Sequence, residues 1–386
     1  MPKSAIIVSQ SGQITDGLPK AVSEIGHDVS ETFVAERGED KTYHLSRSLL
    51  EPIEEAVVGL SGSGSGPERP YLVIDGTAHP GQIVDLADRL PPTAVRDRRG
   101  AVLESLAEQN PVASVRSELR RAKVSIRREK TKQRGGEHDK PGGERGTVSD
   151  YEGRCQRLRE QVDMRGKKVR KRVSEAYGGS DGYALVLGGF GARTTEVWSA
   201  LTGTEKVTRS PTRPASSKTE EVSVGPHTVA VTDVPCIPPE GIGGWFGEAV
   251  PSVLGALSRA DIVLSVGDET EAGMLEGIAE TFGCEHSHIG EPDGTGSVAN
   301  RALDAVSNSL GSVGCRLRLP YGDGTESLIS KLYDDSVVRD VSYGEDVLVH
   351  TTVPEDYMDE MKHSVEEIGG EVTVTEASGG GRTSSG

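Results

Sequence analysis

Over residues 1–113, short apolar runs alternate with longer segments in which apolar positions recur every three or four residues. The runs have the length and composition of buried β-strands, and the longer segments have the period of amphipathic helices. The predicted strands are 4–10, 29–34, 71–76 and 93–97, and the predicted helices are 17–25, 44–58, 81–90 and 101–107. This alternation predicts a small α/β domain over residues 1–113.

Residues 114–178 predict a pair of basic helices. The first covers 114–134, and its apolar positions share one face while arginines cover the others. That apolar face consists of Val115, Leu119, Ala122 and Ile126. Segment 135–146 holds five glycines and a proline, which ends the helix, and a second helix is predicted over 149–176. Two helices joined by a glycine-rich tip predict a helical hairpin.

A strand, a glycine-rich turn and an amphipathic helix follow each other over residues 183–203. This is the scaffold of a phosphate-binding P-loop, which reads G-x-x-x-x-G-K-[ST]. Gly188 keeps the first glycine, and Thr195 keeps the hydroxyl that faces Mg²⁺ in that motif. Arg193 replaces the second glycine and Thr194 replaces the lysine.

Strands and helices continue to residue 313 and predict a P-loop domain over 179–313. They comprise a hairpin over 222–233, helices over 245–257, 269–282 and 298–309, and strands over 261–266 and 286–289. A different pattern, strand–helix–strand–strand–helix–strand, then predicts a ferredoxin-like α+β module over 314–375. The Gly- and Ser-rich segment 376–386 predicts a disordered tail.

Composition narrows the class of protein. The chain has 386 residues, of which 34% are hydrophobic, and it has neither a signal-peptide pattern nor an apolar run long enough to span a bilayer. We therefore expect a soluble, cytoplasmic protein with no membrane partner. Four cysteines lie far apart with no C-x-x-C pair, which favours buried thiols over a metal site or disulfides.

Charge is strongly segregated along the chain. The net charge is −17, yet residues 116–172 hold 20 Lys/Arg and 9 Asp/Glu. A basic block in an acidic protein predicts a site for a polyanion, and a solvated helical face is the alternative reading. The acid excess, with 14 lysines in all, is also typical of proteins from salt-accumulating halophiles.

Several segments, in order, resemble the HflX family of ribosome-associated GTPases. The segments that carry the resemblance are VRDRRGAVLESLAEQ, the hairpin tip around Pro141–Glu144, LGGFGARTTEVWSALTG, SPTRPASSK, VAVTDVPC, SRADIVLSVGD and RLRLPYGDGTESLISKLYDDSVV. Together they cover nearly the whole chain. The resemblance implies a Ras-like P-loop G domain between an N-terminal α/β domain with its basic hairpin and a C-terminal ferredoxin-like module.

The resemblance also implies ligands and site residues. It implies GTP and Mg²⁺ as cofactors, and the large ribosomal subunit with its rRNA as partner; no DNA is expected. The implied nucleotide-binding positions are Gly188, Gly191, Arg193, Thr194, Thr195, Asp233 and Asp293. The implied metal ligands are Thr195, Thr212 and Asp233. The expected RNA-binding residues are Arg120, Arg121, Lys123, Arg127, Arg128, Lys167, Lys168 and Arg170.

The departures from the family pattern lie where nucleotide chemistry takes place. The P-loop lysine is missing, and Cys236 replaces the glycine of the D-x-x-G motif that begins at Asp233. The N-K-x-D guanine clamp is absent, and in the nearest string, Gly290–Asp293 of the turn GEPDGTG, only the aspartate survives. This turn corresponds either to the base-binding loop or to the Ser-Ala loop that follows it. Only a short segment separates Asp293 from the C-terminal module, so one strand–helix unit of a complete G domain is missing. No catalytic residue is predicted.

These observations leave three readings open. The first is an HflX-like homologue that binds the large subunit while its guanine-nucleotide binding and hydrolysis are weakened or lost. The second is an active HflX-type GTPase that binds and splits ribosomes, with Arg193 acting in place of the lysine. The third is a protein-interaction scaffold with no RNA role.

Overall fold

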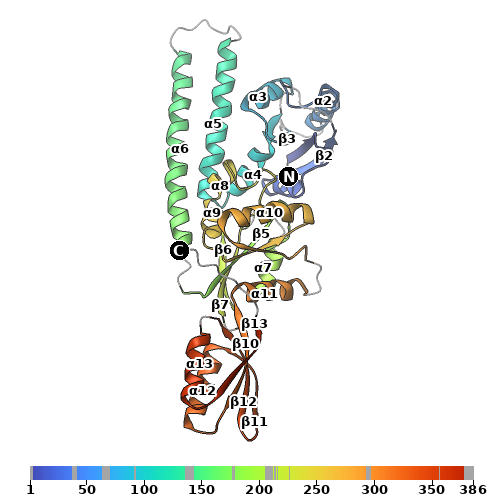
Figure 1. Ribbon diagram of the computed structural model, residues 1–386. Coiled ribbons are helices and arrows are strands. Elements are labelled where there is room, and N and C mark those ends of the chain that lie inside the picture. The colour runs from blue at the N-terminus through green and yellow to red at the C-terminus, as the bar shows by residue number, and fades with distance from the viewer. Residues whose placement is uncertain are drawn as a thin grey trace.

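The structure is a computed structural model, and it describes residues 3–36, 41–62, 70–90, 93–134, 143–175, 179–204, 212, 214, 216–225, 227–292, 297–355 and 357–377. The chain is of mixed α/β class and contains three sheets and a long helical hairpin, stacked along one direction (Figure 1). Within the part of the chain described, no helix is long and apolar enough to cross a membrane.

The N-terminal domain is a four-stranded parallel sheet with strand order β2-β1-β3-β4. Its strands are β1 (Lys3–Ser9), β2 (His27–Val34), β3 (Tyr71–Asp75) and β4 (Ala94–Asp97). Its helices are α1 (Leu18–Glu24), α2 (Arg47–Gly62), α3 (Pro80–Arg89) and α4 (Arg98–Ala107). These match the predicted elements, and residues 63–69, between α2 and β3, lie outside the described residues.

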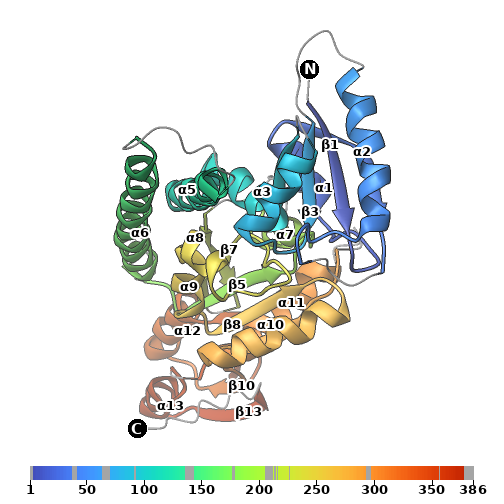
Figure 2. The same ribbon diagram turned by 90° about the horizontal axis from the view of Figure 1, so that it is seen from above.

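The basic hairpin consists of α5 (Pro111–Arg134) and α6 (Gly143–Glu175). The two helices run side by side, with α6 on the side of α5 that faces away from the N-terminal domain in both ribbon views (Figures 1 and 2). Apolar residues along the seam hold them together, namely Val112, Val115, Leu119, Ala122, Cys155, Leu158 and Val162. The second helix begins at Gly143, earlier than the predicted start at residue 149, and the tip residues 135–142 lie outside the described residues.

The central domain is a five-stranded sheet of order β6-β7-β5-β8-β9, in which only β6 runs antiparallel. Its strands are β5 (Gly182–Gly188), β6 (Lys218–Val224), β7 (His227–Asp233), β8 (Ile262–Val266) and β9 (Glu285–His288). Its helices are α7 (Thr194–Thr202), α8 (Trp245–Ala249), α9 (Pro251–Leu257), α10 (Glu269–Phe282) and α11 (Ser297–Ser309). This is the arrangement of a P-loop G domain that lacks one strand–helix unit, because α11 leads directly into the next module.

One predicted helix of this domain is divided in two. The segment 245–257 forms α8 and α9, because Val250 has an extended φ of −123° and Pro251 then starts a new helix. The residue before a proline is pushed out of the helical region by the proline ring, which accounts for the break.

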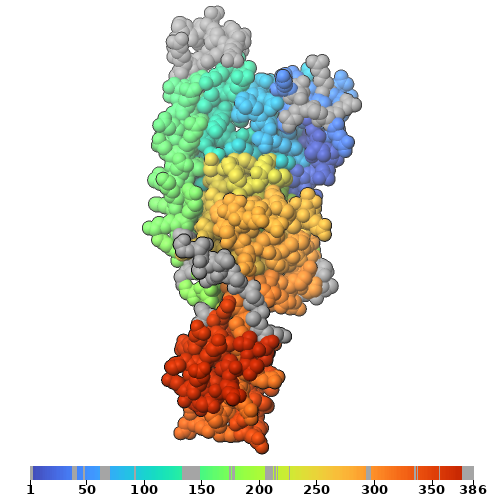
Figure 3. All heavy atoms as spheres, in the orientation of Figure 1, coloured from blue at the N-terminus to red at the C-terminus, as the bar shows by residue number. Residues whose placement is uncertain are grey.

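The C-terminal module is an antiparallel sheet of order β11-β12-β10-β13, which is the ferredoxin-like arrangement. Its elements are β10 (Ser312–Leu319), α12 (Asp323–Asp335), β11 (Val337–Tyr343), β12 (Val347–Pro354), α13 (Met358–Glu367) and β13 (Glu371–Ala377). It projects as a separate lobe at one end of the molecule (Figure 3). β13 extends into the segment predicted as a tail, and residues 378–386 lie outside the described residues.

The N-terminal and central domains share one hydrophobic core. Along β1, Ala5 and Ile7 belong to this shared core, whereas Ile6 and Val8 pack into a second core beneath α2 and α3. Successive residues of a strand point to opposite faces, so one face of the sheet is committed to the neighbouring domain. The C-terminal module has its own core, built around Leu317 and Met361.

Candidate functional site

The predicted phosphate loop lies at the carboxyl end of β5, at the centre of the five-stranded sheet. β5 pairs with β7 on one side and β8 on the other and ends at Gly188, and α7 begins at Thr194. Gly191 within the turn has a φ of +114°, which side-chain-bearing residues rarely adopt. The chain therefore forms the strand–turn–helix scaffold at the edge of the sheet where open α/β proteins bind ligands.

Side chains of the turn itself fill the turn. A methyl group built on Gly188 would lie 2.6 Å from Cγ2 of Thr194 and 2.7 Å from Cβ of Ala192. Thr194 takes the place of the motif's lysine and is only 1% exposed. Its side chain closes the loop instead of reaching towards a phosphate.

The Glu271 carboxyl group lies directly over the turn. A methyl group built on Gly189 would be 2.0 Å from Cδ of Glu271, so this carboxyl group occupies the space next to the loop backbone. Burial, together with the nearby carboxylates of Asp268, Glu291 and Asp16, raises the pKa of Glu271 to about 7. An anionic ligand in the loop would have to displace an acidic side chain.

The N-terminal domain covers the other side of the turn. A methyl group on Gly191 would lie 3.1 Å from the carbonyl carbon of Asp16 and 3.2 Å from the backbone nitrogen of Gly17. These two residues belong to the loop between β1 and α1. The close approach of two backbones explains why this position requires glycine.

Asp233 and Thr195 meet as the motif predicts, but they bond to each other. The Thr195 hydroxyl donates to Oδ2 of Asp233 at 2.9 Å, and Asp233 is completely buried at the end of β7. Its other oxygen, Oδ1, has no hydrogen-bond partner among the described residues. Burial raises the pKa of Asp233 to about 7, against the lowering effect of the threonine hydroxyls.

Cys236 closes the site from the side of the chain that follows β7. Its thiol donates to the carbonyl oxygen of Ala192 at 3.5 Å and lies 3.9 Å from Oγ1 of Thr194. Burial and the Asp233 carboxyl group raise the pKa of the thiol to about 12. The next backbone N–H, that of Ile237, donates to the carbonyl oxygen of Gly188 at 2.8 Å, so this segment pairs with the loop.

Arg193 does not supply a cation to the loop. Its guanidinium forms a two-pronged ion pair with Glu196 on the first turn of α7. The remaining nitrogen donates to the carbonyl oxygen of Pro292 at 2.6 Å. The Arg193 side chain is therefore bonded on the side of the domain where the chain continues after β9.

The two remaining predicted ligands are separate from this cluster. Thr212 is buried against the N-terminal domain, where its hydroxyl lies 2.7 Å from that of Ser105 and donates to Glu24. Asp293 lies outside the described residues. The predicted metal ligands therefore do not assemble as a set, and no cluster of three or more His, Cys, Asp or Glu side chains suited to a metal ion occurs among the described residues.

The residues present do not fit Mg²⁺ with a nucleotide. Mg²⁺ needs octahedral coordination by oxygen atoms, and substrate phosphates and water usually provide several of these ligands. Here a hydroxyl proton points at the one central carboxyl group, and Thr194 and Cys236 fill the space beside it.

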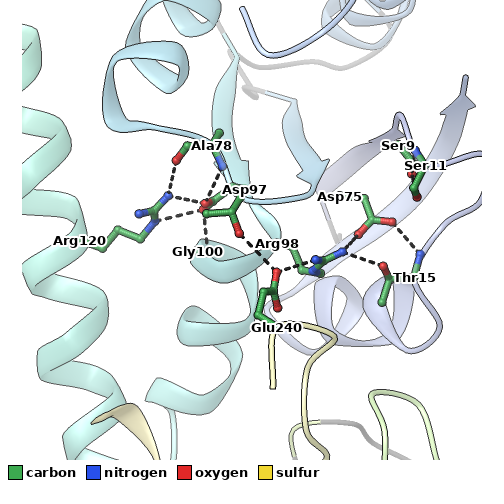
Figure 4. A network of polar contacts seen from close by, with 11 residues as sticks. Ser9, Ser11, Thr15, Asp75, Ala78, Asp97, Arg98, Gly100, Arg120 and Glu240 are labelled. Carbon is green, nitrogen blue, oxygen red and sulfur yellow. Dashed lines mark hydrogen bonds and ion pairs between the residues drawn. The ribbon is translucent and has the colours of Figure 1, made fainter. Parts of the chain in front are cut away.

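A polar network holds the segment after β7 against the N-terminal domain (Figure 4). Arg98, the first residue of α4, pairs with Asp75 at 2.7 Å and with Glu240 at 2.5 Å. Asp75 also accepts from the backbone N–H of Thr15 at 2.6 Å, and Thr77 donates to Glu240 at 3.3 Å. With Ile237 bonded to the phosphate loop, segment 234–240 is fixed on both sides.

The predicted RNA-binding residues of the hairpin divide into exposed and internal groups. The exposed residues are Arg121, Arg128, Lys167, Lys168 and Arg170, while Lys123 and Arg127 are half-buried. Arg120 is internal: its side chain is 11% exposed, pairs with Asp97 and donates to the carbonyl oxygen of Ala78 (Figure 4). Its role is to fasten α5 to the N-terminal domain.

Sequence reasoning missed the residues that close the site. Glu271 lies in the first turn of α10 behind its N-cap, Asp268, where acidic residues are common in any helix. Asp16 and Glu240 lie in loops with no motif. Their contacts with the phosphate loop or its neighbouring segment are made over long sequence distances, so no local pattern could reveal them.

Comparisons with known proteins find similarity in structure alone. No family model and no curated protein matches the sequence. A crystal structure of SsGBP with GDP is 12% identical, with a TM-score of 0.43, over 79% of this chain and 98% of that chain. A GTP-binding protein from the hyperthermophilic archaeon Sulfolobus solfataricus, also with GDP, is 13% identical, with a TM-score of 0.39, over 80% and 100%. At this level of identity, neither match bears on what this chain binds.

Proposed function

We propose that this protein is an HflX-like homologue of GTP-binding proteins that associates with the large ribosomal subunit through its rRNA. In this proposal its guanine-nucleotide binding and hydrolysis are weakened or lost, and Mg²⁺ is lost with them. The observation that carries the proposal is the contrast between a phosphate loop packed shut by Glu271, Thr194 and Cys236 and a hairpin with exposed cations.

The nucleotide part of the proposal rests on the number of contacts that are absent or replaced. A charge-assisted hydrogen bond contributes about 1.5–3 kcal/mol, and each ~1.4 kcal/mol changes affinity tenfold. The loop has no lysine, Arg193 is bonded to Glu196, and the Glu271 carboxyl group occupies the space of an anion. Losing two such contacts corresponds to a weakening of at least about a hundredfold.

The RNA part rests on charge and shape. The exposed residues are Arg121 and Arg128 on α5 and Lys167, Lys168 and Arg170 on α6. These two helices are long and antiparallel (Figure 1). Arginine binds phosphate through a planar fork of N–H groups, and a basic stripe along a helix is the electrostatic footprint of a nucleic-acid site. Such binding needs no nucleotide.

Calorimetry with GTP, GDP and ATP in the presence of Mg²⁺ tests the nucleotide part. We expect weak binding with little preference for guanine over adenine. A sub-micromolar, Mg²⁺-dependent and guanine-selective dissociation constant would instead favour the active GTPase.

Co-sedimentation with large ribosomal subunits at several salt concentrations, with and without GTP, tests the RNA part. Changing Arg121, Arg128, Lys167 and Lys168 to glutamine should weaken binding and flatten its salt dependence, because each phosphate contact contributes roughly one unit or less to the log–log slope. Changing the exposed Lys20, Lys41, Arg339 and Lys362 to glutamine is the charge-matched control and should leave binding unchanged. Equal binding by both variants would favour the scaffold without an RNA role.

A further inference from the structure

A cleft of about 400 Å³ lies between the N-terminal domain and the hairpin. It is bounded by the loop that follows β3, by the first turn of α4 and by α5. Its walls include Arg99, Arg116, Arg120 and Lys123, and none of the described residues that line it is acidic. It therefore differs from the phosphate loop, where carboxyl groups converge.

Two of the four cations are already neutralised. Arg120 pairs with Asp97, and Arg116 pairs with Glu248 of α8. Neither Arg99 nor Lys123 has an acidic partner among the residues that the structure describes. The guanidinium of Arg99 instead lies 5.6 Å from the ring centroid of Trp245, against an aromatic face. The cleft thus carries two uncompensated positive charges.

The positive charges of the cleft residues repel one another. Burial, together with the charges of Arg120 and Arg116, lowers the pKa of Arg99 to about 10. Burial also lowers the pKa of Lys123, as do Arg116 and the α6 residue Arg159. The Nε atoms of Arg99 and Arg116 are buried with no hydrogen-bond partner among the described residues. Buried N–H donors without acceptors are costly, and an oxyanion would satisfy them.

The position of the cleft in the fold agrees with this chemistry. Thr77 and His79 directly follow β3, and Arg99 directly follows β4, so the cleft lies at the carboxyl ends of parallel strands. Open α/β sheets bind ligands at that edge. Its volume is within the range of small-molecule sites.

We propose that the cleft between α3, α4 and α5 is a binding site for a phosphate group, held by Arg99 and Lys123 with Arg116 beside them. The phosphate belongs either to a small phosphate ester or to the backbone of an RNA. The site is independent of the closed phosphate loop and of the exposed cations of the hairpin.

Calorimetric titration of the full chain with inorganic pyrophosphate, at fixed ionic strength, tests the site. The native protein should give a saturable one-site isotherm, and Arg99→Gln with Lys123→Gln should weaken the affinity by about 10- to 100-fold or more. Lys20→Gln with Lys362→Gln removes the same charge from exposed positions outside the hairpin and should leave the affinity unchanged. A native protein without saturable binding, or equal weakening in both variants, would overturn the proposal.

A second arm identifies the source of the phosphate. If RNA backbone enters the cleft, pyrophosphate should displace a short single-stranded RNA from the native protein but not from the Arg99/Lys123 variant. If the ligand is a small ester, RNA affinity should be indifferent to pyrophosphate in both proteins.

Thermal melting in phosphate-free buffer should show the variant to be as stable as the native protein, since mutual repulsion is removed. If the double variant fails to fold, Lys123→Gln alone, at a half-buried position, should still weaken pyrophosphate binding, and unchanged binding in that variant would overturn the proposal.

Discussion

Asp233 is fully buried, and only one of its two carboxyl oxygens accepts a hydrogen bond among the described residues. Its pKa of about 7 lies above the value near 4 of an unfolded chain, so the folded protein holds the proton more tightly. Stability from this group is fully present below pH 4 and is lost as pH rises through 7. Asp233→Asn should therefore raise stability at pH 8, by at most about 4 kcal/mol, and change little at pH 4.

Urea unfolding from pH 4 to 8 measures this effect. Glu271 has the same sign of shift and remains in the variant, so the pH slope should shrink and not disappear. Adding Glu271→Gln should flatten the profile further. Parallel pH profiles for the native protein and Asp233→Asn would show that the carboxyl group is ionised in the folded state.

A repair of the phosphate loop tests which side chains close it. Arg193→Gly with Thr194→Lys restores the motif letters, but the Glu271 carboxyl group still lies over Gly189. We expect the double variant to bind GTP no better than the native protein. Adding Glu271→Gln should raise affinity about tenfold or more, since a charge conflict is removed.

The triple variant should still fail to hydrolyse GTP, because Cys236 and the missing guanine clamp remain. Equilibrium dialysis and phosphate release measure the two properties separately. Tight GTP binding by the double variant would mean that Glu271 moves aside without cost.

At the residue scale, the sequence predicted which groups converge but not what they do. The spacing of a P-loop and a D-x-x-G motif brings Thr195 to Asp233, and the structure has that contact. The motif could not indicate that the two would bond to each other and not to a metal ion. The site is closed by Glu271 over Gly189 and by Cys236 beside Thr194, and these contacts join distant parts of the chain.

At the element scale, α5 depends on one buried ion pair. Asp97 is completely buried and caps α4 by accepting from the backbone N–H of Gly100 at 2.9 Å, while its charge is balanced by Arg120. Breaking such a pair leaves an uncompensated buried charge. Arg120→Met should therefore cost about 3–5 kcal/mol of stability.

Arg121→Met is the matched control, because Arg121 is next to Arg120 on α5 but is exposed. Its replacement should change stability by less than about 0.5 kcal/mol. Denaturant unfolding compares the two variants. If both cost equally little, the Arg120–Asp97 pair does not hold α5 in place. An RNA-binding test that includes Arg120 would confuse loss of stability with loss of a phosphate contact.

The turn at Gly191 lies at the junction of the N-terminal and central domains, so substitutions there test how closely the two domains pack. Its φ of +114° disfavours other residues, and Asp16 and Gly17 leave no room for a side chain. Gly191→Ala should cost about 1–3 kcal/mol from backbone strain, with an added clash. Gly203→Ala, in the left-handed C-cap of α7 with open space around it, should cost about 1 kcal/mol. Thermal melts that rank Gly203→Ala as the more harmful change would contradict this junction.

Most elements were predictable because each depends on a local pattern. Hydrophobic periodicity predicted the strands of all three sheets, and the order of elements predicted the ferredoxin-like module. The break at Pro251 and the early start of α6 at Gly143 were not predicted. The apolar pattern over 245–257 predicts one continuous helix, and the glycines near residue 143 predict a turn.

At the scale of the whole molecule, the cores predict two cooperative units. The N-terminal and central domains share a core, whereas the C-terminal module has a separate one. Both tryptophans, Trp198 and Trp245, belong to the central domain. Leu317→Ala, at a fully buried position of the separate core, should cost its module about 2–5 kcal/mol.

Thermal unfolding followed by circular dichroism should then show the transition of the C-terminal module at lower temperature in Leu317→Ala. The tryptophan fluorescence transition should not move. A fluorescence transition that shifts together with the circular dichroism transition would show that the three sheets unfold as one unit.

The shared core is the feature of the whole molecule that sequence patterns could not predict. The continuous apolar run in β1 indicates a strand buried on both faces, but helices of its own domain would satisfy both faces equally well. That Ala5 and Ile7 face the central domain is decided by which surfaces meet. Local periodicity contains no information about that choice.

The fixed position of segment 234–240 affects how release from a binding partner is timed. In a working GTPase the loop beside the γ-phosphate moves when that phosphate leaves, and hydrolysis thereby acts as a clock for release. Here the segment is bonded to Gly188 at one end and, through Glu240, to Arg98 at the other. Under the proposed function, nucleotide hydrolysis does not time the release of a partner. The lifetime of the complex then depends on the strength of its contacts and on the salt concentration, and the complex ends by competition or dilution.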